Sequence, residues 1–162
     1  MTRSATFRKR FATADPAALR ECGPAADAQR RTLLAGSRIA VIEPGSDTKR
    51  FLYERAAALG VDLVLVGERS SWARELVDKG AAARYLDADS SGHPDSAARA
   101  VLAALGDEAQ CLDGVLTFWE DAVPATARVA AALGLPGLPP AAADGARSKL
   151  RTLEASRAAG LP

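Results

Sequence analysis

Short apolar runs alternate with segments of helical spacing along the chain from residue 38 onward. Four runs, at residues 39–42, 62–66, 83–86 and 114–117, have the length and composition of β-strands. The first two are apolar almost without interruption, which is typical of strands that are covered on both faces. The segments between the runs carry apolar residues three or four positions apart, as in amphipathic helices.

Glycines mark the ends of the expected helices. Gly60, Gly80, Gly106 and Gly134 each follow a segment of helical spacing, where glycine commonly ends a helix. Strands that alternate with helices predict a parallel sheet with right-handed crossovers. We therefore expect an α/β fold, a Rossmann-like parallel sheet of about four strands flanked by helices.

The two ends of the chain have a different character. Residues 1–37 carry seven Lys or Arg against three Asp or Glu, and we expect them to form a basic, disordered extension. Their first 14 residues also have the composition of an organelle transit peptide, and this alternative stays open. We place the Rossmann-like domain at residues 38–138. Residues 139–162 are interpreted as a linker and one helix.

Composition excludes several classes of protein. The 162 residues suit one domain, and 48% apolar with 25% charged residues is ordinary for a globular chain. A net charge of +1 gives no reason to expect a nucleic-acid partner. No apolar stretch approaches the roughly 20 residues that span a bilayer, so no membrane partner is expected. Cys22 and Cys111 are too few and too far apart for a disulfide framework or a zinc site, which favours a cytoplasmic location.

In a parallel sheet, ligands bind beyond the carboxyl ends of the strands. The residues there include Glu43, Glu68 and Glu120. Dinucleotide binding is disfavoured, because Gly45 is followed by Ser46-Asp47-Thr48-Lys49 rather than by further glycines. We expect Glu120 to be accessible beside Glu43, with Trp119 packed near the sheet edge. Two carboxylates would favour a cation such as the ammonium of an amino acid.

Asp121 has two interpretations. It could contribute to the same ammonium site, or it could simply be the N-cap of the following helix.

The carboxyl-terminal third of the chain carries the most specific motifs. They are Asp113-Gly114-Val115-Leu116-Thr117-Phe118-Trp119-Glu120-Asp121, Ser148-Lys149-Leu150-Arg151-Thr152 and Gly160-Leu161-Pro162. This arrangement resembles the start of ATP-grasp carboxylate–amine ligases, and it looks most like the carnosine-synthase and L-amino-acid-ligase branch. Two positions depart from the family pattern, which often has Asp where Ser148 stands and Asn where Leu138 stands.

The resemblance implies a function for the complete protein. It would join two amino acids through an acyl phosphate, with ATP and Mg²⁺ as cofactors, and Lys149 would reach the ATP phosphates. Without the resemblance, Lys149 is an ordinary solvated charge on a helix. The family's metal ligands and glycine-rich lid lie downstream, so we expect no catalytic residue and no metal site in this chain. The resemblance therefore implies an N-terminal fragment, inactive by itself, whose linker and helix lead toward an absent ATP-grasp domain.

Two interpretations of another class stay open. The chain could be a stand-alone small-ligand binding domain that uses Glu43 and Glu120. It could also be a docking module for a separately encoded catalytic half, and it could form a homo-oligomer.

Overall fold

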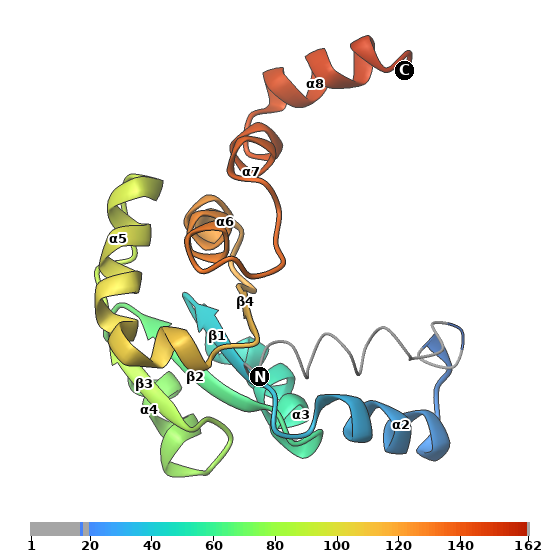
Figure 1. Cartoon of the computed structure of the whole chain (residues 1–162), viewed down its shortest axis with the longest axis vertical. Helices are drawn as coiled ribbons and strands as arrows, with labels where there is room; N and C mark the ends of the chain where they lie inside the picture. Colours follow the sequence, from blue (N-terminus) through green and yellow to red (C-terminus); the bar gives the residue numbers. More distant parts are fainter. Residues whose placement is uncertain (1–16, 18–19, 162) are drawn as a thin grey trace.

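A computed structural model describes residue 17 and residues 20–161. Its centre is a four-stranded parallel sheet in the order β3-β2-β1-β4 (Figure 1). The strands are β1 (Arg38–Ile42), β2 (Asp62–Gly67), β3 (Arg84–Asp87) and β4 (Gly114–Leu116). The predicted α/β fold and its parallel pairing are confirmed.

The strand register brings the carboxyl ends of the strands to one edge of the sheet. Ile42 of β1 is paired with Val66 of β2, and Val41 is paired with Leu116 of β4. Val66 is in turn paired with Leu86 of β3. The loops that follow the four strands therefore emerge side by side. From β1 the chain continues to β2 and β3 on one side of β1 and then crosses to β4 on the other side, so the topological switch point lies between β1 and β4.

Helices cover both faces of the sheet. One face, with Ala40 and Ile42, packs against α5 (Pro94–Leu105) and α6 (Val123–Ala132). The other, with Val41 and Leu65, packs against α3 (Arg50–Ala58) and α4 (Ser71–Asp78). Successive residues of a strand point to opposite faces, so uninterrupted apolar runs supply both cores.

The glycines that were predicted to end helices do so. Gly60, Gly80, Gly106 and Gly134 follow α3, α4, α5 and α6, with φ between 48° and 79°. Residues with a Cβ rarely adopt this conformation, which explains why glycine stands at these positions.

Part of the segment that was expected to be disordered forms a helix, α2 (Pro24–Leu34). Ala26 and Leu33 of this helix are buried. The Arg31 Nε donates a hydrogen bond of 3.2 Å to the carbonyl oxygen of Ala58, at the end of α3. For residues 24–34 the expectation of disorder was wrong, because a few contacts to α3 stabilise this helix although it has no broad apolar face. Residues 1–14, on which the transit-peptide alternative depends, lie outside the described residues.

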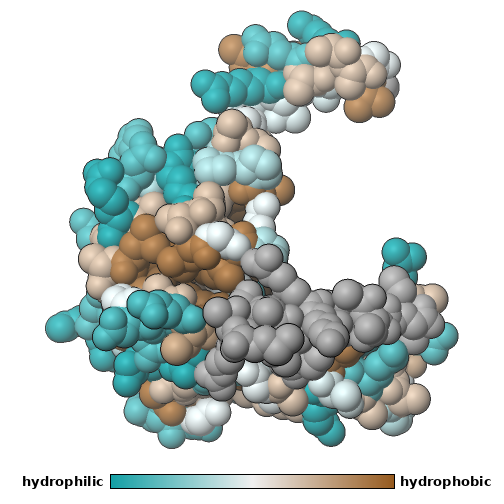
Figure 2. Space-filling view, viewed as in Figure 1, coloured by the Kyte–Doolittle hydropathy of each residue, from teal (hydrophilic) through white to brown (hydrophobic). Residues whose placement is uncertain are grey.

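The carboxyl-terminal part consists of α7 (Pro140–Ala146) and α8 (Lys149–Ala158). Ala143 of α7 is buried, whereas α8 buries none of its residues. In Figures 1 and 2, α8 stands apart from the body of the molecule. The domain boundary predicted at residues 138–139 stays a prediction. Within the described residues, no helix is long and apolar enough to cross a membrane.

A pair of leucines tests this division between core and exposed helix. Leu65 is fully buried in β2, and Leu150 of α8 is exposed. We expect Leu65→Ala to lower the free energy of unfolding by about 2–5 kcal/mol, because it leaves a cavity in the core. Leu150→Ala should change it by less than about 0.5 kcal/mol. Denaturant titration of both variants is the measurement, and equal losses would contradict the described packing.

Candidate functional site

The loop that follows β1 has an unusual backbone. Of the non-glycine residues that the structure describes, Glu43 alone has a positive φ, at 50°. Its backbone N–H donates a hydrogen bond of 2.9 Å to the carbonyl oxygen of Val66, which extends the pairing of β1 with β2 by one residue. Such conformations cost free energy and persist only where neighbouring contacts fix them.

The Glu43 side chain supplies those contacts. Its Oε1 accepts a hydrogen bond of 3.1 Å from the backbone N–H of Glu68 and a second one from the Ser90 hydroxyl. Gly67 makes room for the carboxylate, since a Cβ at that position would lie 2.7 Å from Oε1. Glu43 thereby joins the loops that follow β1, β2 and β3.

Aromatic side chains bind the backbone of the next two residues of this loop, Pro44 and Gly45. The Tyr53 hydroxyl donates a hydrogen bond of 2.7 Å to the carbonyl oxygen of Pro44, and the Trp72 Nε1 donates one of 3.0 Å to that of Gly45. The Tyr53 ring makes edge contacts with Trp72 and Phe118, each with ring centroids 5.7 Å apart. Burial, and secondarily Glu43, raises the pKa of Tyr53, so the phenol stays a neutral donor.

The loop after β4 is joined to the same loop by Lys49. Its Nζ donates a hydrogen bond to the carbonyl oxygen of Phe118 and lies 5.0 Å from the ring centroid of Trp119. Trp119 remains 41% exposed. It therefore packs at the sheet edge, as expected, and also presents its ring to solvent.

These loops enclose a cleft of about 340 Å³, which we call the acidic cleft. Its carboxylates are Glu43, Glu68 and Asp121, and the rest of its lining is Ser90, Ser91, Gly92, Trp119 and Ala122. It lies at the carboxyl ends of the strands and includes the loops of β1 and β4, where α/β sheets bind ligands. The arrangement can attract a cation and offers hydroxyl groups and an aromatic face beside it.

Glu120 is accessible, as expected, but the structure does not place it beside Glu43 in the acidic cleft. Glu120 is not among the cleft residues; its side chain is 82% exposed and its Oε1 lies 2.6 Å from the Arg147 Nη1. A 3₁₀ turn, Glu120–Ala122, follows Trp119. Within this turn it is Asp121, the residue after Glu120, that lies at the cleft. Asp121 does not cap α6, since its carboxylate pairs with Arg147 instead. Spacing alone could not distinguish two adjacent acidic residues in a turn.

Glu68 was expected among the residues beyond the strand ends, with no ligand assigned to it, and the structure places it at the acidic cleft. Its side chain lines the acidic cleft, while its backbone carbonyl accepts a hydrogen bond from the Tyr85 hydroxyl. Burial, together with the charges of Asp87 and Glu43, raises the pKa of Tyr85 to about 12. The position of Glu68 directly after β2 is the feature of the sequence that predicted this place.

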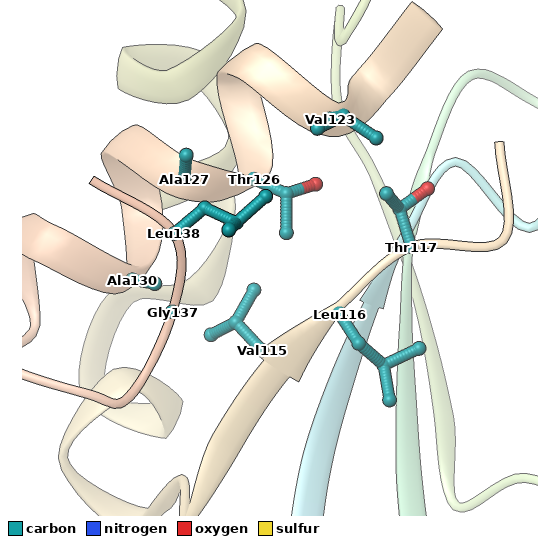
Figure 3. A pocket seen from close by; sticks show the side chains of 9 residues that line it. All are labelled: Val115, Leu116, Thr117, Val123, Thr126, Ala127, Ala130, Gly137 and Leu138. Carbon is teal, nitrogen blue, oxygen red and sulfur yellow. The ribbon is translucent and has the colours of Figure 1, made fainter. Parts of the chain in front are cut away.

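A second cleft of about 250 Å³ lies between β4, α6 and the connector before α7 (Figure 3). Its lining is apolar apart from the hydroxyls of Thr117 and Thr126, and the latter donates a hydrogen bond to the Ala122 carbonyl. This cleft has no charged lining residue. It is therefore poorly suited to phosphates or to a zwitterionic amino acid.

Lys149, the expected phosphate ligand, lies far along the chain from the cleft loops, at the first position of α8. The Ser148 hydroxyl caps this helix by accepting a hydrogen bond of 3.3 Å from the Arg151 backbone. Lys149 itself is exposed. Across the part of the chain that the structure describes, no group of three or more His, Cys, Asp or Glu residues is placed to hold a metal ion.

Fold and site together define a Rossmann-like α/β domain with an acidic cleft at its switch point. Residues 53–137 match the family model described as "ATP-grasp N-terminal domain". The match covers more than half of the chain, which therefore belongs to the ATP-grasp N-terminal domain family, as its motifs indicated.

Three curated relatives are similar to the chain. Carnosine synthase 1 of Mus musculus is 35% identical over 125 residues, 75% of this chain and 14% of that protein. Carnosine synthase 1 of Gallus gallus is 35% identical over 123 residues, 74% of this chain and 13% of that protein. The Homo sapiens protein of the same name is 30% identical over 125 residues, again 75% and 14%. The chain thus aligns with about one seventh of these relatives. No solved structure matches it.

Gly67→Ala tests the link between Glu43 and the neighbouring loops. The added Cβ would meet the Glu43 Oε1 at 2.7 Å and the Pro44 Cδ at 3.1 Å. We expect a loss of about 1–3 kcal/mol in the free energy of unfolding from this overpacking.

Gly145→Ala is the matched control. Gly145 lies in α7, and a Cβ there meets nothing within 4 Å. Alanine should stabilise this helix position by up to about 1 kcal/mol. Thermal and denaturant unfolding measure both variants, and a neutral Gly67→Ala would show that the carboxylate is not held where the structure has it.

Proposed function

We propose that this chain is the N-terminal portion of an ATP-dependent carboxylate–amine ligase that joins two amino acids. The observation that carries the proposal is an acidic cleft at the switch point of a domain of the ATP-grasp N-terminal family. The similarity to carnosine synthases supports the dipeptide-forming branch of such ligases.

The acidic cleft would bind the ammonium group of an amino-acid substrate. Glu68 and Asp121 contribute carboxylates, and Glu43 contributes its Oε2, which takes part in no hydrogen bond within the described residues. Charge-assisted hydrogen bonds to an ammonium are among the stronger polar contacts. The exposed Trp119 ring could add a cation–π contact.

The charges of the cleft also suggest which substrate it binds. Negative charge nearby stabilises the protonated form of an amine and raises its pKa. A protonated amine has no free electron pair with which to attack. The cleft is therefore suited to the amino acid whose carboxylate is activated, and the attacking amine of the other substrate would bind elsewhere.

The reaction has two steps. The substrate carboxylate would attack the γ-phosphorus of ATP, forming an acyl phosphate and releasing ADP. The unprotonated amine would then attack the acyl carbon, forming the amide, while phosphate leaves and the amine loses a proton. Mg²⁺, when bound in the complete enzyme, would neutralise charge on the phosphates. The described residues do not form a site for this ion, and Lys149 is the one phosphate ligand that we assign to the chain by resemblance.

A second candidate function is a small-ligand binding or docking domain that works without catalysis. It is favoured by one observation, that all eight lining residues of the acidic cleft lie between positions 43 and 122. For either function we propose the cytoplasm as the compartment, with an organelle as the alternative because of the basic residues 1–14. A homo-oligomer and a separately encoded catalytic half remain proposals for partners.

Amine binding by the purified chain tests the site. Titration with β-alanine, L-histidine and L-lysine should give saturable heat and a change in tryptophan fluorescence at about millimolar concentration, equivalent to roughly 4 kcal/mol. Glu68→Gln should weaken this binding several-fold, because it removes one carboxylate. Glu154→Gln, which removes an exposed carboxylate on α8, should not. If no amine binds, or if both variants behave alike, the proposed amine site is wrong.

ATP dependence tests the role of Lys149. The chain alone should form no dipeptide and should bind ATP weakly, since one charge-assisted contact contributes about 1.5–3 kcal/mol against the roughly 5–7 kcal/mol of a useful nucleotide affinity. In the complete enzyme, Lys149→Ala should raise the KM for ATP and leave the fold intact. Lys79→Ala, at an exposed lysine after α4, is the control. Dipeptide formation by the chain alone would contradict the fragment interpretation, and an unchanged KM would contradict the phosphate role.

A further inference from the structure

We infer that Arg147 is an electrostatic latch that holds α8 and competes with cations in the acidic cleft for Asp121. Arg147 lies between α7 and α8, and its side chain reaches two acidic residues of the loop after β4. The Nη1 lies 2.6 Å from the Glu120 Oε1, and the Nη2 donates a hydrogen bond to the Asp121 Oδ1. One guanidinium thus connects the start of the last helix to the cleft wall.

The helix on the near side of Arg147 is firmly attached to the body. Arg128 of α6 donates two parallel hydrogen bonds of 2.9 Å to the Asp144 carboxylate of α7. Arg128 also pairs with Asp95 of α5. Hydrogen bonds from Arg128 hold the pKa of Asp144 below its usual value, so the pair stays ionised above that range. Any movement of α8 must therefore start after α7.

The chain changes direction where α7 ends. Arg147 keeps helical dihedral angles, with φ −83° and ψ −7°, whereas Ser148 is extended, with φ −111° and ψ 109°. Beyond this point α8 buries no residue. The Thr152 hydroxyl donates a hydrogen bond of 3.3 Å to the Gly145 carbonyl. The Ser148 backbone N–H donates a further hydrogen bond of 3.0 Å to the same carbonyl. Arg147 lies directly before this change of direction, so its ion pairs fix the point from which α8 begins.

The ion pairs of Arg147 with Glu120 and Asp121 can break and re-form readily. The side chains of Arg147, Glu120 and Asp121 are 35%, 82% and 69% exposed, and ion pairs this exposed are weak and are screened by salt. A weak contact can be exchanged for another of similar strength. Asp121 lines the acidic cleft, so a cation bound there is the natural competitor.

Competition couples the cleft to Lys149. If a cleft cation takes Asp121, Arg147 retains only its exposed pair with Glu120, and α8 with Lys149 is held less firmly. By thermodynamic reciprocity, removing Arg147 must strengthen cation binding in the cleft. This coupling rests on the proposed function, whereas the latch itself does not.

Distance measurements by double electron–electron resonance test the latch. In a Cys22→Ser and Cys111→Ser background, spin labels at Glu54→Cys and Glu154→Cys report the separation of α3 and α8, and both positions are exposed. We expect a narrow distribution that Arg147→Gln broadens, as does 1 M salt. Arg157→Gln, which removes an exposed arginine from α8, should leave it narrow. Arg147→Glu combined with Glu120→Lys and Asp121→Lys should restore the narrow distribution.

Unchanged distances in Arg147→Gln would overturn the latch, provided that its unfolding midpoint matches that of Arg157→Gln. Calorimetric titration with the three amino acids then tests the coupling. Arg147→Gln should bind them up to about fivefold more tightly than Arg157→Gln, as expected for loss of a competing surface pair. Equal affinities would overturn the competition while the amine site stands. An absence of binding in all variants would overturn the amine site and the competition, and the distances would still decide the latch.

Discussion

The acidic cleft depends on one carboxylate that is fixed before any ligand arrives. Glu43 Oε1 accepts hydrogen bonds from Glu68 N–H and the Ser90 hydroxyl, and this position is open to it only because Gly67 has no Cβ. Glu43 also has a positive φ, of 50°. Backbone strain at a strand end is commonly found at functional sites, where surrounding contacts compensate it. Because the contacts of Glu43 join three loops, the shape of the cleft belongs to the folded sheet and not to a flexible lid.

The sequence was sufficient for the sheet, since the apolar runs 39–42 and 62–66 can be stable only if both faces are covered. It did not predict α2, which buries only Ala26 and Leu33 and is attached to α3 by a hydrogen bond from Arg31 to the carbonyl oxygen of Ala58. Such contacts depend on the tertiary structure and leave no periodic signal. The site was predictable to the level of the strand ends that form it. Glu120 and Asp121 are neighbours in one 3₁₀ turn, where successive side chains point about a third of a turn apart. Only the structure shows that Asp121 lines the cleft while Glu120 is exposed to solvent.

The clefts and the family relationship together suggest how the work of a ligase is divided. The acidic cleft has three carboxylates, which would repel ATP, and the second cleft has no charged lining residue at all. A nucleoside triphosphate needs positive charge and a metal ion, so in the proposed ligase its binding site would be formed largely by other parts of the complete protein. This agrees with a match confined to an N-terminal family domain and to about one seventh of the relatives. In the proposed ligase, this chain would be the part that selects an amino acid.

The same electrostatics determine which of the two amino acids can act as the nucleophile in the proposed ligase. An amine held among carboxylates stays protonated, and it is thereby protected from reacting with the acyl phosphate formed on its own molecule or on a second copy. The attacking amine must be bound where no such charges keep its proton. Discrimination between the two substrates would then require no difference in their side chains, because the cleft assigns the role of acyl donor to whichever amino acid places its ammonium there. Asp121 belongs to that cleft and also binds Arg147. The assignment of the donor and the position of α8, which carries Lys149, would therefore depend on one shared carboxylate.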